Sequence, residues 1–172
     1  MRPVPIEHSY EVIADRLYAG EYPRSKDNQT SPAKVRQFLD FGITDFIDLT
    51  EEHELKPYTA WLPDGIGHRR FPIIDLTPPK TMEQLHDIHR TIDRLILSDK
   101  KVYVHCWGGI NRTGFIVGCW FVYKGATVAE AMSEFERLWA TNPKSGWEVP
   151  LICGRKDYVT KYADWLKKNG RA

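Results

Sequence analysis

Hydrophobic residues recur along this chain with two different periods. Five short runs are either apolar throughout or alternate with polar residues, as buried and half-buried strands do, at 10–14, 17–22, 44–49, 68–74 and 102–104. The first two runs flank Asp15 and Arg16, and this spacing predicts a hairpin at the edge of a sheet.

Longer segments carry apolar residues every three or four positions, as amphipathic helices do. We predict that Ser31 is the N-cap of a helix with Pro32 in its first turn and a stop at Gly42. Capping-box patterns at 81–84 and 127–130 open two further helices. Three more helical segments are predicted at 57–62, 113–124 and 151–168.

Strands interleaved with helices indicate an α/β fold, with one central mixed sheet of four or five strands flanked by helices. The 172 residues contain no repeat or linker and suit a single domain that covers residues 1–172. We therefore expect one hydrophobic core system and one principal functional site.

The composition narrows the class of protein. Charge is nearly balanced, with 24 Lys and Arg against 23 Asp and Glu, which disfavours a broad basic surface for nucleic acid or anionic lipid. Cys106, Cys119 and Cys153 are too few and too unevenly spaced for a disulfide scaffold or zinc site. No signal-peptide pattern occurs, and no run approaches the ~18 apolar residues of a membrane span. We expect a soluble cytoplasmic monomer that binds neither nucleic acid nor membranes.

The run at 102–104 leads into the strongest chemical pattern of the chain. Gly108 and Gly109 lack a Cβ, so the N–H groups of this loop can turn inward, and an apolar helix follows at once. Amides that converge at a helix N-terminus form an anion site. Five residues separate Cys106 from Arg112, so one loop can direct a thiol and a guanidinium at the same phosphate.

A helix N-terminus, inward amides and a nearby arginine all favour the thiolate, so we expect Cys106 to be ionised at neutral pH. A thiolate that faces a bound phosphate monoester can displace the ester oxygen in line and form a thiophosphoryl-enzyme, which water then hydrolyses. Arg112 would bind two equatorial oxygens, a geometry that suits its planar fork. This chemistry needs no metal and no other cofactor.

The motif formed by His105, Cys106, five residues, Arg112, Thr113 and Gly114 resembles the active-site motif of the protein tyrosine phosphatase superfamily, and the chain length is similar to its dual-specificity branch. Weaker similarities lie at 17–23, 48–53 and 71–75. The resemblance implies a phosphatase-like fold with a thiophosphoryl-cysteine intermediate. It also implies that the Thr113 hydroxyl donates to the sulfur; the alternative is an ordinary residue of the first helical turn.

The leaving oxygen needs a proton, which a carboxylic acid at the same sheet edge can supply. We assign this role to Asp75, because it ends a predicted strand in a proline-stiffened loop and matches the general acid of the family in place and context. The alternative is that Asp75 only caps a turn. The rival acids are Asp48, within an apolar strand, and Glu51, Glu52 and Glu54 in the loop that follows it.

The remaining residues of the motif have supporting roles. Strand alternation directs His105 away from the pocket, so we expect it to be buried and bonded to loop carbonyls. Trp107 either stacks on an aryl substrate at the rim or packs on a neighbouring loop. Backbone donors to the phosphate are expected from Gly108, Gly109, Ile110 and Asn111.

Several residues outside the motif could also have a role at the site. Arg24, Arg69 and Arg70 could bind a second acidic group on the substrate, or could be ordinary surface residues. Cys119 is predicted to belong to the core. Cys153 could form a regulatory disulfide with the catalytic thiol if the fold brings the two together.

Differences from the family bear on the substrate. Classical tyrosine-specific members carry a phosphotyrosine-stacking loop, which this chain lacks, so a shallower pocket is expected. The five loop residues include no charge, which disfavours polyphosphoinositides. Some relatives place a water-positioning Gln near the segment 150–158, where this chain has no Gln and Arg155 occupies the corresponding region.

These observations predict a cysteine-dependent phosphatase that acts on phosphotyrosine, and more broadly on phosphoserine or phosphothreonine, in phosphorylated proteins and peptides. Two alternatives come from other classes. A silent phosphoprotein-binding module would keep the anion site but lose the nucleophile or acid, whereas Cys106 and Asp75 are both present. A sulfur-transfer or arsenate-reducing enzyme would not need Asp75 on a separate loop.

Overall fold

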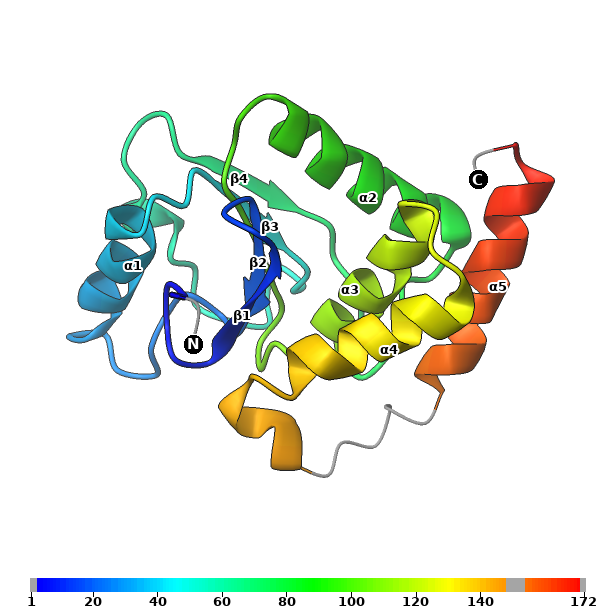
Figure 1. The fold of residues 1–172 in the computed structure, drawn as a ribbon. Helices are drawn as coiled ribbons and strands as arrows, with labels where there is room; N and C mark the ends of the chain where they lie inside the picture. The colour runs from blue at the N-terminus through cyan, green and yellow to red at the C-terminus, as the bar shows by residue number, and fades with distance from the viewer. Residues whose placement is uncertain (1–2, 148–153, 171–172) are drawn as a thin grey trace.

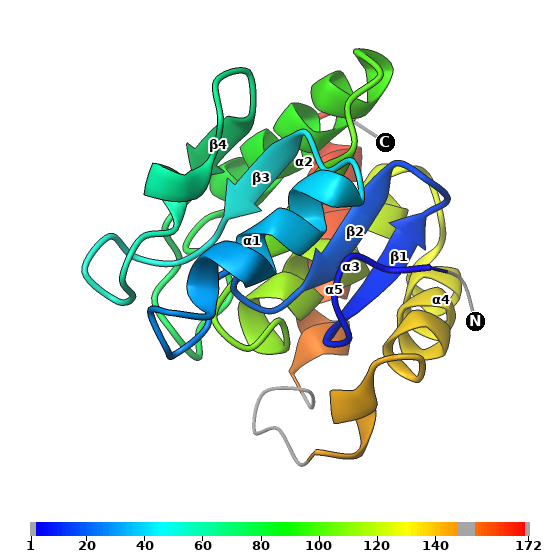
Figure 2. The same ribbon diagram turned by 90° about the vertical axis from the view of Figure 1, so that its left-hand side faces the viewer.

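A central sheet divides the protein into two layers of helices (Figure 1). The structure is a computed structural model that describes residues 3–147 and 154–170. Helix α1 lies on one face of the sheet, and α2 to α5 cover the other (Figure 2). The elements in chain order are β1 Ser9–Ile13, β2 Leu17–Gly20, α1 Ser31–Asp40, β3 Asp45–Asp48, η1 Thr59–Trp61, β4 Gly67–Arg70, α2 Met82–Leu97, β5 Val102–His105, α3 Asn111–Tyr123, α4 Val128–Trp139, η2 Pro143–Gly146 and α5 Arg155–Lys168.

The sheet has the order β1-β2-β5-β3-β4. Strand β5 is central and parallel to both β2 and β3, β4 is parallel to β3, and β1 pairs antiparallel with β2. The register places Val104 between Ala19 and Ile47. This arrangement confirms the α/β fold, the mixed sheet and the edge hairpin. Because the four parallel strands end at one edge, the segments that follow β2, β3, β4 and β5 all leave from that edge.

Two hydrophobic cores lie on the two faces of the sheet. The larger core packs α2 to α5 on the sheet, and its centre is α3, which contacts β5, α2, α4 and α5. The smaller core packs α1 on the opposite face, where Phe38 lies against the rings of Phe46 and Tyr103. No helix of the described residues, the strongly apolar α3 included, is long and apolar enough to span a membrane.

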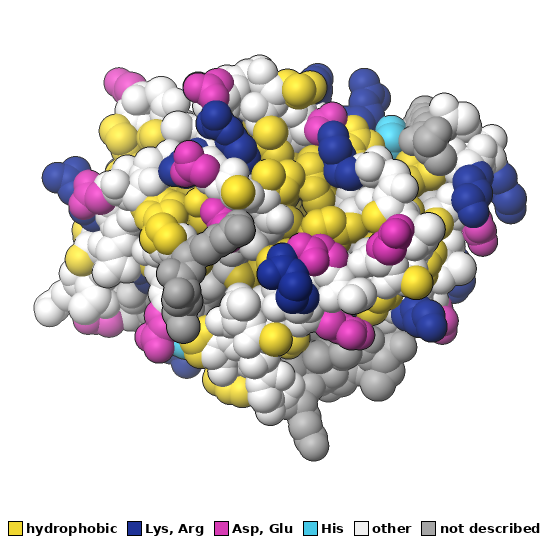
Figure 3. Space-filling model, in the orientation of Figure 1, with side chains coloured by type: hydrophobic (Ala, Val, Ile, Leu, Met, Phe, Trp, Pro, Cys, Tyr) yellow, Lys and Arg dark blue, Asp and Glu magenta, His cyan; other side chains and the backbone are white. Residues whose placement is uncertain are grey.

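The face shown in Figure 3 carries Lys and Arg side chains interspersed with Asp and Glu. Surface ion pairs among the described residues include Arg137 with Glu134 and Lys124 with Asp93. This distribution agrees with the nearly balanced charge of the sequence, and it presents no broad basic area on that face.

Several predicted boundaries are wrong by a few residues. Ser31 is the first residue of α1 rather than its N-cap, because its Oγ donates to the carbonyls of Ser25 and Asp27 instead of capping the helix. The run at 68–74 ends as a strand at Arg70, because Pro72 has no N–H to continue the ladder.

Two helical predictions also change in extent. The predicted helix at 57–62 is a single 3₁₀ turn, η1. The last helix begins at Arg155 in the structure, and the earlier part of its predicted range lies outside the described residues.

The two capping boxes differ. At α4, Thr127 accepts from the Glu130 N–H while the Glu130 side chain accepts from the Thr127 N–H, so the predicted box is complete. At α2, the Thr81 Oγ1 accepts from the Gln84 N–H, but the Gln84 Oε1 accepts from the N–H of Lys80. Only half of the second predicted box is therefore formed.

Substitutions on the two sides of α1 test its packing on the sheet. Phe38 is fully buried, whereas Arg36 is largely exposed and forms only a weak i,i+4 contact with Asp40. Phe38→Ala should lower the free energy of unfolding by about 3–5 kcal/mol, because it removes an aromatic ring from the smaller core. Arg36→Ala should change it by less than about 0.5 kcal/mol. Urea unfolding of both variants checks the contrast, and equal losses would contradict this packing.

Candidate active site

Cys106 lies at the centre of the edge where the parallel strands end. It follows β5 directly, and its side chain is 3% exposed. Five residues later, Arg112 lies in the first turn of α3 and is fully buried. The segment between them is the loop predicted from sequence, and we call residues 106–112 the phosphate loop.

The phosphate loop packs closely on the end of β2. Gly109 has φ +72°, and a Cβ at this position would lie 2.2 Å from the carbonyl carbon of Gly20, so only glycine fits. The Trp107 carbonyl accepts from the Tyr22 N–H at 2.8 Å. These contacts fix the backbone of the loop against its neighbouring strand.

A lysine from a distant segment also holds the phosphate loop. Lys144, in η2, is almost fully buried, and its ammonium donates to the Gly108 carbonyl at 3.1 Å and to Glu21 Oε2 at 2.6 Å. Glu21 also accepts from Lys34 at 2.7 Å. Burial alone would raise the pKa of Glu21, but the bonds from the two lysines lower it below its usual value. No local signal in the sequence predicts this long-range tie.

Arg112 is held by groups that leave the sheet after β3 and β4. Its Nη1 and Nη2 donate to the two carboxylate oxygens of Glu54, both at 2.6 Å, and Nη1 also donates to the Ile73 carbonyl at 3.1 Å. Asp75 Oδ1 lies 3.0 Å from Nη2. Burial alone would lower the pKa of Arg112, but hydrogen bonding to Glu54 and the charge of Cys106 raise it above its usual value. Arg112 is therefore a permanent cation with a fixed orientation.

The sequence suggests Glu54 only as a rival of Asp75 for the role of proton donor. The structure instead shows its carboxylate engaged with the Arg112 fork. Burial would raise the pKa of Glu54, but the Arg112 hydrogen bonds lower it below the usual value, so the group stays ionised. An ionised carboxylate cannot donate a proton, which disfavours Glu54 as the acid.

Asp48 is also committed to structural contacts. Its side chain is fully buried and accepts from Thr50, His68 and Arg70. Burial would raise the pKa of Asp48, but the electrostatic interaction with nearby His105 and the hydrogen bonds from His68 and Thr50 lower it well below its usual range. By contrast, the Asp75 side chain is 47% exposed at the edge of the site.

His105 is fully buried, as expected, and it bonds a carbonyl of the loop. Its Nδ1 lies 3.3 Å from the Cys106 carbonyl, which can only accept, so Nδ1 carries the proton. Its Nε2 lies 2.8 Å from the Tyr58 hydroxyl and therefore accepts from it. Burial lowers the pKa of His105 to about 4, and Asp48 opposes this shift only in part. The imidazole is thus neutral at pH 7 and fixed in one tautomer.

The predicted bond from Thr113 to the Cys106 sulfur is not formed in this structure. The Thr113 hydroxyl is buried without a hydrogen-bond partner among the described residues, as are Asn111 Oδ1 and Arg112 Nε. All three atoms belong to the first turn of α3, directly after the loop. Arg112 Nε is consequently a free donor next to the predicted phosphate position.

Arg155 has a structural place behind the phosphate loop. Its Nη2 donates to the Ile110 carbonyl at 3.3 Å, and its guanidinium lies 4.4 Å from the centre of the Phe135 ring. A Cβ at Gly114 would lie 2.5 Å from Arg155 Nη2, so the helix leaves a notch that this arginine fills. Sequence inspection found Arg155 only as the residue near an expected Gln.

The other candidate residues separate into two groups. Arg69 and Arg70 pair with Asp45 and Asp48, which explains them as structural cations. Arg24 forms no such pair within the described ranges and lines a pocket beside Trp107, whose side chain is 51% exposed.

Cys119 and Cys153 are the two cysteines outside the phosphate loop. Cys119 is fully buried in the larger core, as expected, and burial raises the pKa of its thiol. The predicted disulfide of Cys153 falls outside the described residues. Within the ranges 3–147 and 154–170, no three His, Cys, Asp or Glu side chains are grouped to hold a metal ion.

Comparison with known proteins places the chain in a family. A profile of the DSP-PTPase phosphatases of polymorphic toxin systems matches residues 19–126, more than half of the chain. The chain therefore belongs to this family of dual-specificity-type protein tyrosine phosphatases, which confirms the resemblance seen in the sequence. A cysteine-based mechanism is general to this family.

Individual relatives agree with this placement. The putative tyrosine phosphatase 067L of Invertebrate iridescent virus 3 is 29% identical over 162 residues, which cover 87% of this chain and 63% of that protein. PTEN1 of Arabidopsis thaliana, a phosphatidylinositol 3,4,5-trisphosphate 3-phosphatase and protein-tyrosine-phosphatase, is 26% identical over 90% of this chain and 37% of its own length. The chain thus spans less than two thirds of either relative.

The fold is shared with solved phosphatase structures. The crystal structure of a mutant form of Tk-PTP superposes with a TM-score of 0.72 at 24% identity, over 95% of this chain and 99% of that chain. Kinase-associated phosphatase superposes with a TM-score of 0.71 at 17% identity, over 88% and 87% of the two chains. The similarity confirms the phosphatase-like α/β fold.

The depressed pKa of His105 predicts how stability depends on pH. An unfolded imidazole takes up a proton below about 6.5, whereas folded His105 does so only near pH 4. The stability contributed by neutral His105 is therefore complete above pH 6.5 and is lost progressively as the pH falls from 6.5 to 4. The variant His105→Asn keeps a donor near the Nδ1 position. When the pH is lowered from 7 to 4.5, its free energy of unfolding should fall by about 2 kcal/mol less than that of wild type.

Urea unfolding at the two pH values measures this difference. His53→Asn, a change at an exposed histidine, is the matched control and should follow wild type. An identical pH dependence in wild type and His105→Asn would show that His105 is not held neutral by the fold.

Proposed function

We propose that this chain is a cysteine-dependent phosphatase that hydrolyses phosphotyrosine in proteins and peptides, and that its site also admits phosphoserine and phosphothreonine. The observation that carries the proposal is the single loop that joins buried Cys106 to buried Arg112 at the N-terminus of α3. Asp75 approaches the same guanidinium from a separate loop. This combination provides what phosphoryl transfer requires: a thiolate that accepts the phosphoryl group and an acid that protonates the leaving oxygen.

In the first step the Cys106 thiolate attacks phosphorus opposite the ester oxygen. A sulfur–phosphorus bond forms, the phosphorus–oxygen ester bond breaks, and neutral Asp75 gives its proton to the leaving oxygen. The free Nε–H of Arg112 and the N–H groups of the loop donate hydrogen bonds to the equatorial phosphoryl oxygens and stabilise their negative charge.

In the second step water attacks the phosphorus of the thiophosphoryl-cysteine. The sulfur–phosphorus bond breaks, Cys106 leaves as a thiolate, and the Asp75 carboxylate accepts the proton of the water. Inorganic phosphate is then released. Both steps use side chains and backbone donors of the chain, with no metal or cofactor in any role.

Glu54 and His105 act as positioning residues in this proposal. The Glu54 carboxylate fixes the plane of the Arg112 guanidinium, so that ordering it costs little when phosphate binds. Neutral His105 holds the Cys106 carbonyl and so supports the backbone that carries the nucleophile. Neither residue needs to touch the substrate.

We also propose that residues 1–172 act as one catalytic domain, as a monomer, in the cytoplasm. Support for the compartment comes from a catalytic thiol in a chain with only three cysteines, because a reducing environment keeps such a thiol active. The proposed substrates are phosphorylated proteins and peptides. Nucleic acid and membranes are not proposed as partners, because the total charge is nearly balanced.

The proposed acid is tested by Asp75→Asn across aryl phosphates of graded phenol pKa. The variant should lose the basic limb of the pH profile of kcat/KM and should be slower by roughly 10²–10⁴ on poor leaving groups, because they depart only with a proton. Turnover of substrates with good leaving groups should slow far less. The turnover rate of the variant should therefore depend more steeply on leaving-group pKa than that of wild type.

Asp64→Asn is the matched control, because Asp64 is exposed on the turn before β4. It should reproduce the wild-type slope and pH profile. If Asp75→Asn also kept both the slope and the basic limb, the proton would have to come from another group, and Asp75 would be excluded.

A further inference from the structure

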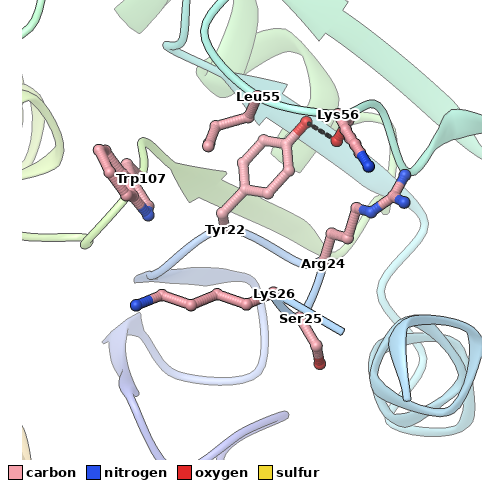
Figure 4. Close-up of a pocket in the computed structure, with 7 residues that line it drawn as sticks. All are labelled: Tyr22, Arg24, Ser25, Lys26, Leu55, Lys56 and Trp107. Atoms are coloured by element: carbon pink, nitrogen blue, oxygen red, sulfur yellow. Dashed lines mark hydrogen bonds between the residues drawn. The ribbon is translucent and has the colours of Figure 1, made fainter. Parts of the chain in front are cut away.

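A small basic pocket adjoins the phosphate loop (Figure 4). Its volume is about 210 Å³, and its walls include Tyr22, Leu55 and Trp107 together with the cations Arg24, Lys26 and Lys56. Pockets that enclose a whole small ligand usually measure about 300–1,000 Å³, so this one suits a single side chain.

The pocket borders the phosphate loop, because the loop residue Trp107 is one of its walls. Trp107 follows Cys106 in the chain, and Leu55 follows Glu54, the carboxylate that holds Arg112. The Tyr22 N–H donates to the Trp107 carbonyl at 2.8 Å. A substrate residue next to the one that enters the phosphate loop would therefore meet this pocket.

The positive charge of the pocket is not neutralised by the protein. Within residues 3–147 and 154–170, none of Arg24, Lys26 and Lys56 forms an ion pair with Asp or Glu, and no acid lines the pocket. The acids nearest in sequence are engaged elsewhere, since Asp27 accepts from the Gln29 N–H and Glu54 binds Arg112. Three unbalanced cations in a chain of net charge +1 leave a local excess of positive charge at this pocket.

Part of this site is already ordered. The Arg24 guanidinium donates to the Pro57 carbonyl at 2.6 Å and to the Asn28 side chain, and it lies 4.8 Å from the centre of the Trp61 ring. In Figure 4, Arg24 and Trp107 lie on opposite sides of Tyr22, whose hydroxyl donates to the Lys56 carbonyl. The rings of Tyr22 and Trp107 thus lie beside the Arg24 cation, which suits a side chain with an apolar stem and an anionic tip.

We propose that this pocket is a specificity subsite for an acidic side chain, either a carboxylate or a second phosphorylated residue, that neighbours the phosphorylated residue of a peptide substrate. The inference rests on the proposed function and adds a substrate class to it. A peptide fits better than an inositol phosphate headgroup, because the pocket combines the apolar side chains of Trp107 and Leu55 with its cations and so suits a side chain that has an apolar stem. The phosphates of a headgroup share one small polar ring and would need cations around the loop itself.

The test compares two phosphotyrosine peptides that differ only in the flanking residues, Glu in one and Ala in the other. Wild type should turn over the acidic peptide about five- to tenfold faster in kcat/KM, and added salt should shrink the difference. Lys26→Gln combined with Lys56→Gln should reduce this preference to less than about twofold, while turnover of the Ala peptide and of a small aryl phosphate stays within about twofold of wild type. Both lysines are exposed and unpaired, so the fold should be preserved.

The matched control is Lys156→Gln with Lys161→Gln, which removes the same charge from exposed sites on α5 and should keep the preference. Equal turnover of both peptides by wild type, with the aryl phosphate still hydrolysed, would overturn the subsite alone. No turnover of the aryl phosphate would overturn the proposed function and the subsite with it. A larger lysine-dependent loss on vesicles that carry a phosphatidylinositol monophosphate than on the acidic peptide would overturn the peptide assignment.

Discussion

The buried charge of Arg112 is the constraint on which the arrangement of the site depends. An unpaired guanidinium in the interior would cost several kcal/mol, so the fold must bring negative and carbonyl groups to it. Glu54 and Asp75 supply the charge, and the Ile73 carbonyl supplies a further acceptor. These partners follow β3 and β4, while Arg112 itself follows β5. One ion cluster therefore joins the segments that follow three strands, at the edge of the sheet where Cys106 lies.

This constraint also explains which acids remain for chemistry. Glu54 is kept ionised by Arg112, and Asp48 is kept ionised by His68 and Thr50, so neither carries a proton to give. Asp75 touches the same guanidinium but remains half exposed on a proline-containing loop. Among these carboxylates, Asp75 is therefore the one we propose as the proton donor, because it is the most exposed of the three at the edge of the site.

The sequence predicted those parts of the structure that local chemistry determines. Cys106 and Arg112 share one loop, the Thr127 cap is complete, and the strand and helix periods identify the α/β fold. The parts that depend on distant contacts were missed or incomplete. Lys144 reaches Gly108 from a segment far along the chain, and Arg155 fills a notch that only the helix packing creates.

The same distinction explains what the sequence leaves open. Its place in an exit loop makes Glu54 a rival acid ranked below Asp75, whereas its ion pair with Arg112 is visible only in the structure. Ser31 was assigned as a cap because its type fits, although in the structure its hydroxyl bonds to the preceding turn. Residue type and spacing therefore identify candidate site residues. The order of the parallel strands in the folded chain shows which of these residues come into contact.

The central claim is that Cys106 is the nucleophile of a covalent phosphoryl transfer. Rapid acid quenching of the enzyme during turnover of an aryl phosphate, followed by mass spectrometry of its peptides, tests it most directly. The account predicts a single phosphoryl group on Cys106 that appears before phosphate release and is absent from Cys106→Ser. A phosphoryl group on another residue, or steady turnover by Cys106→Ser, would contradict it.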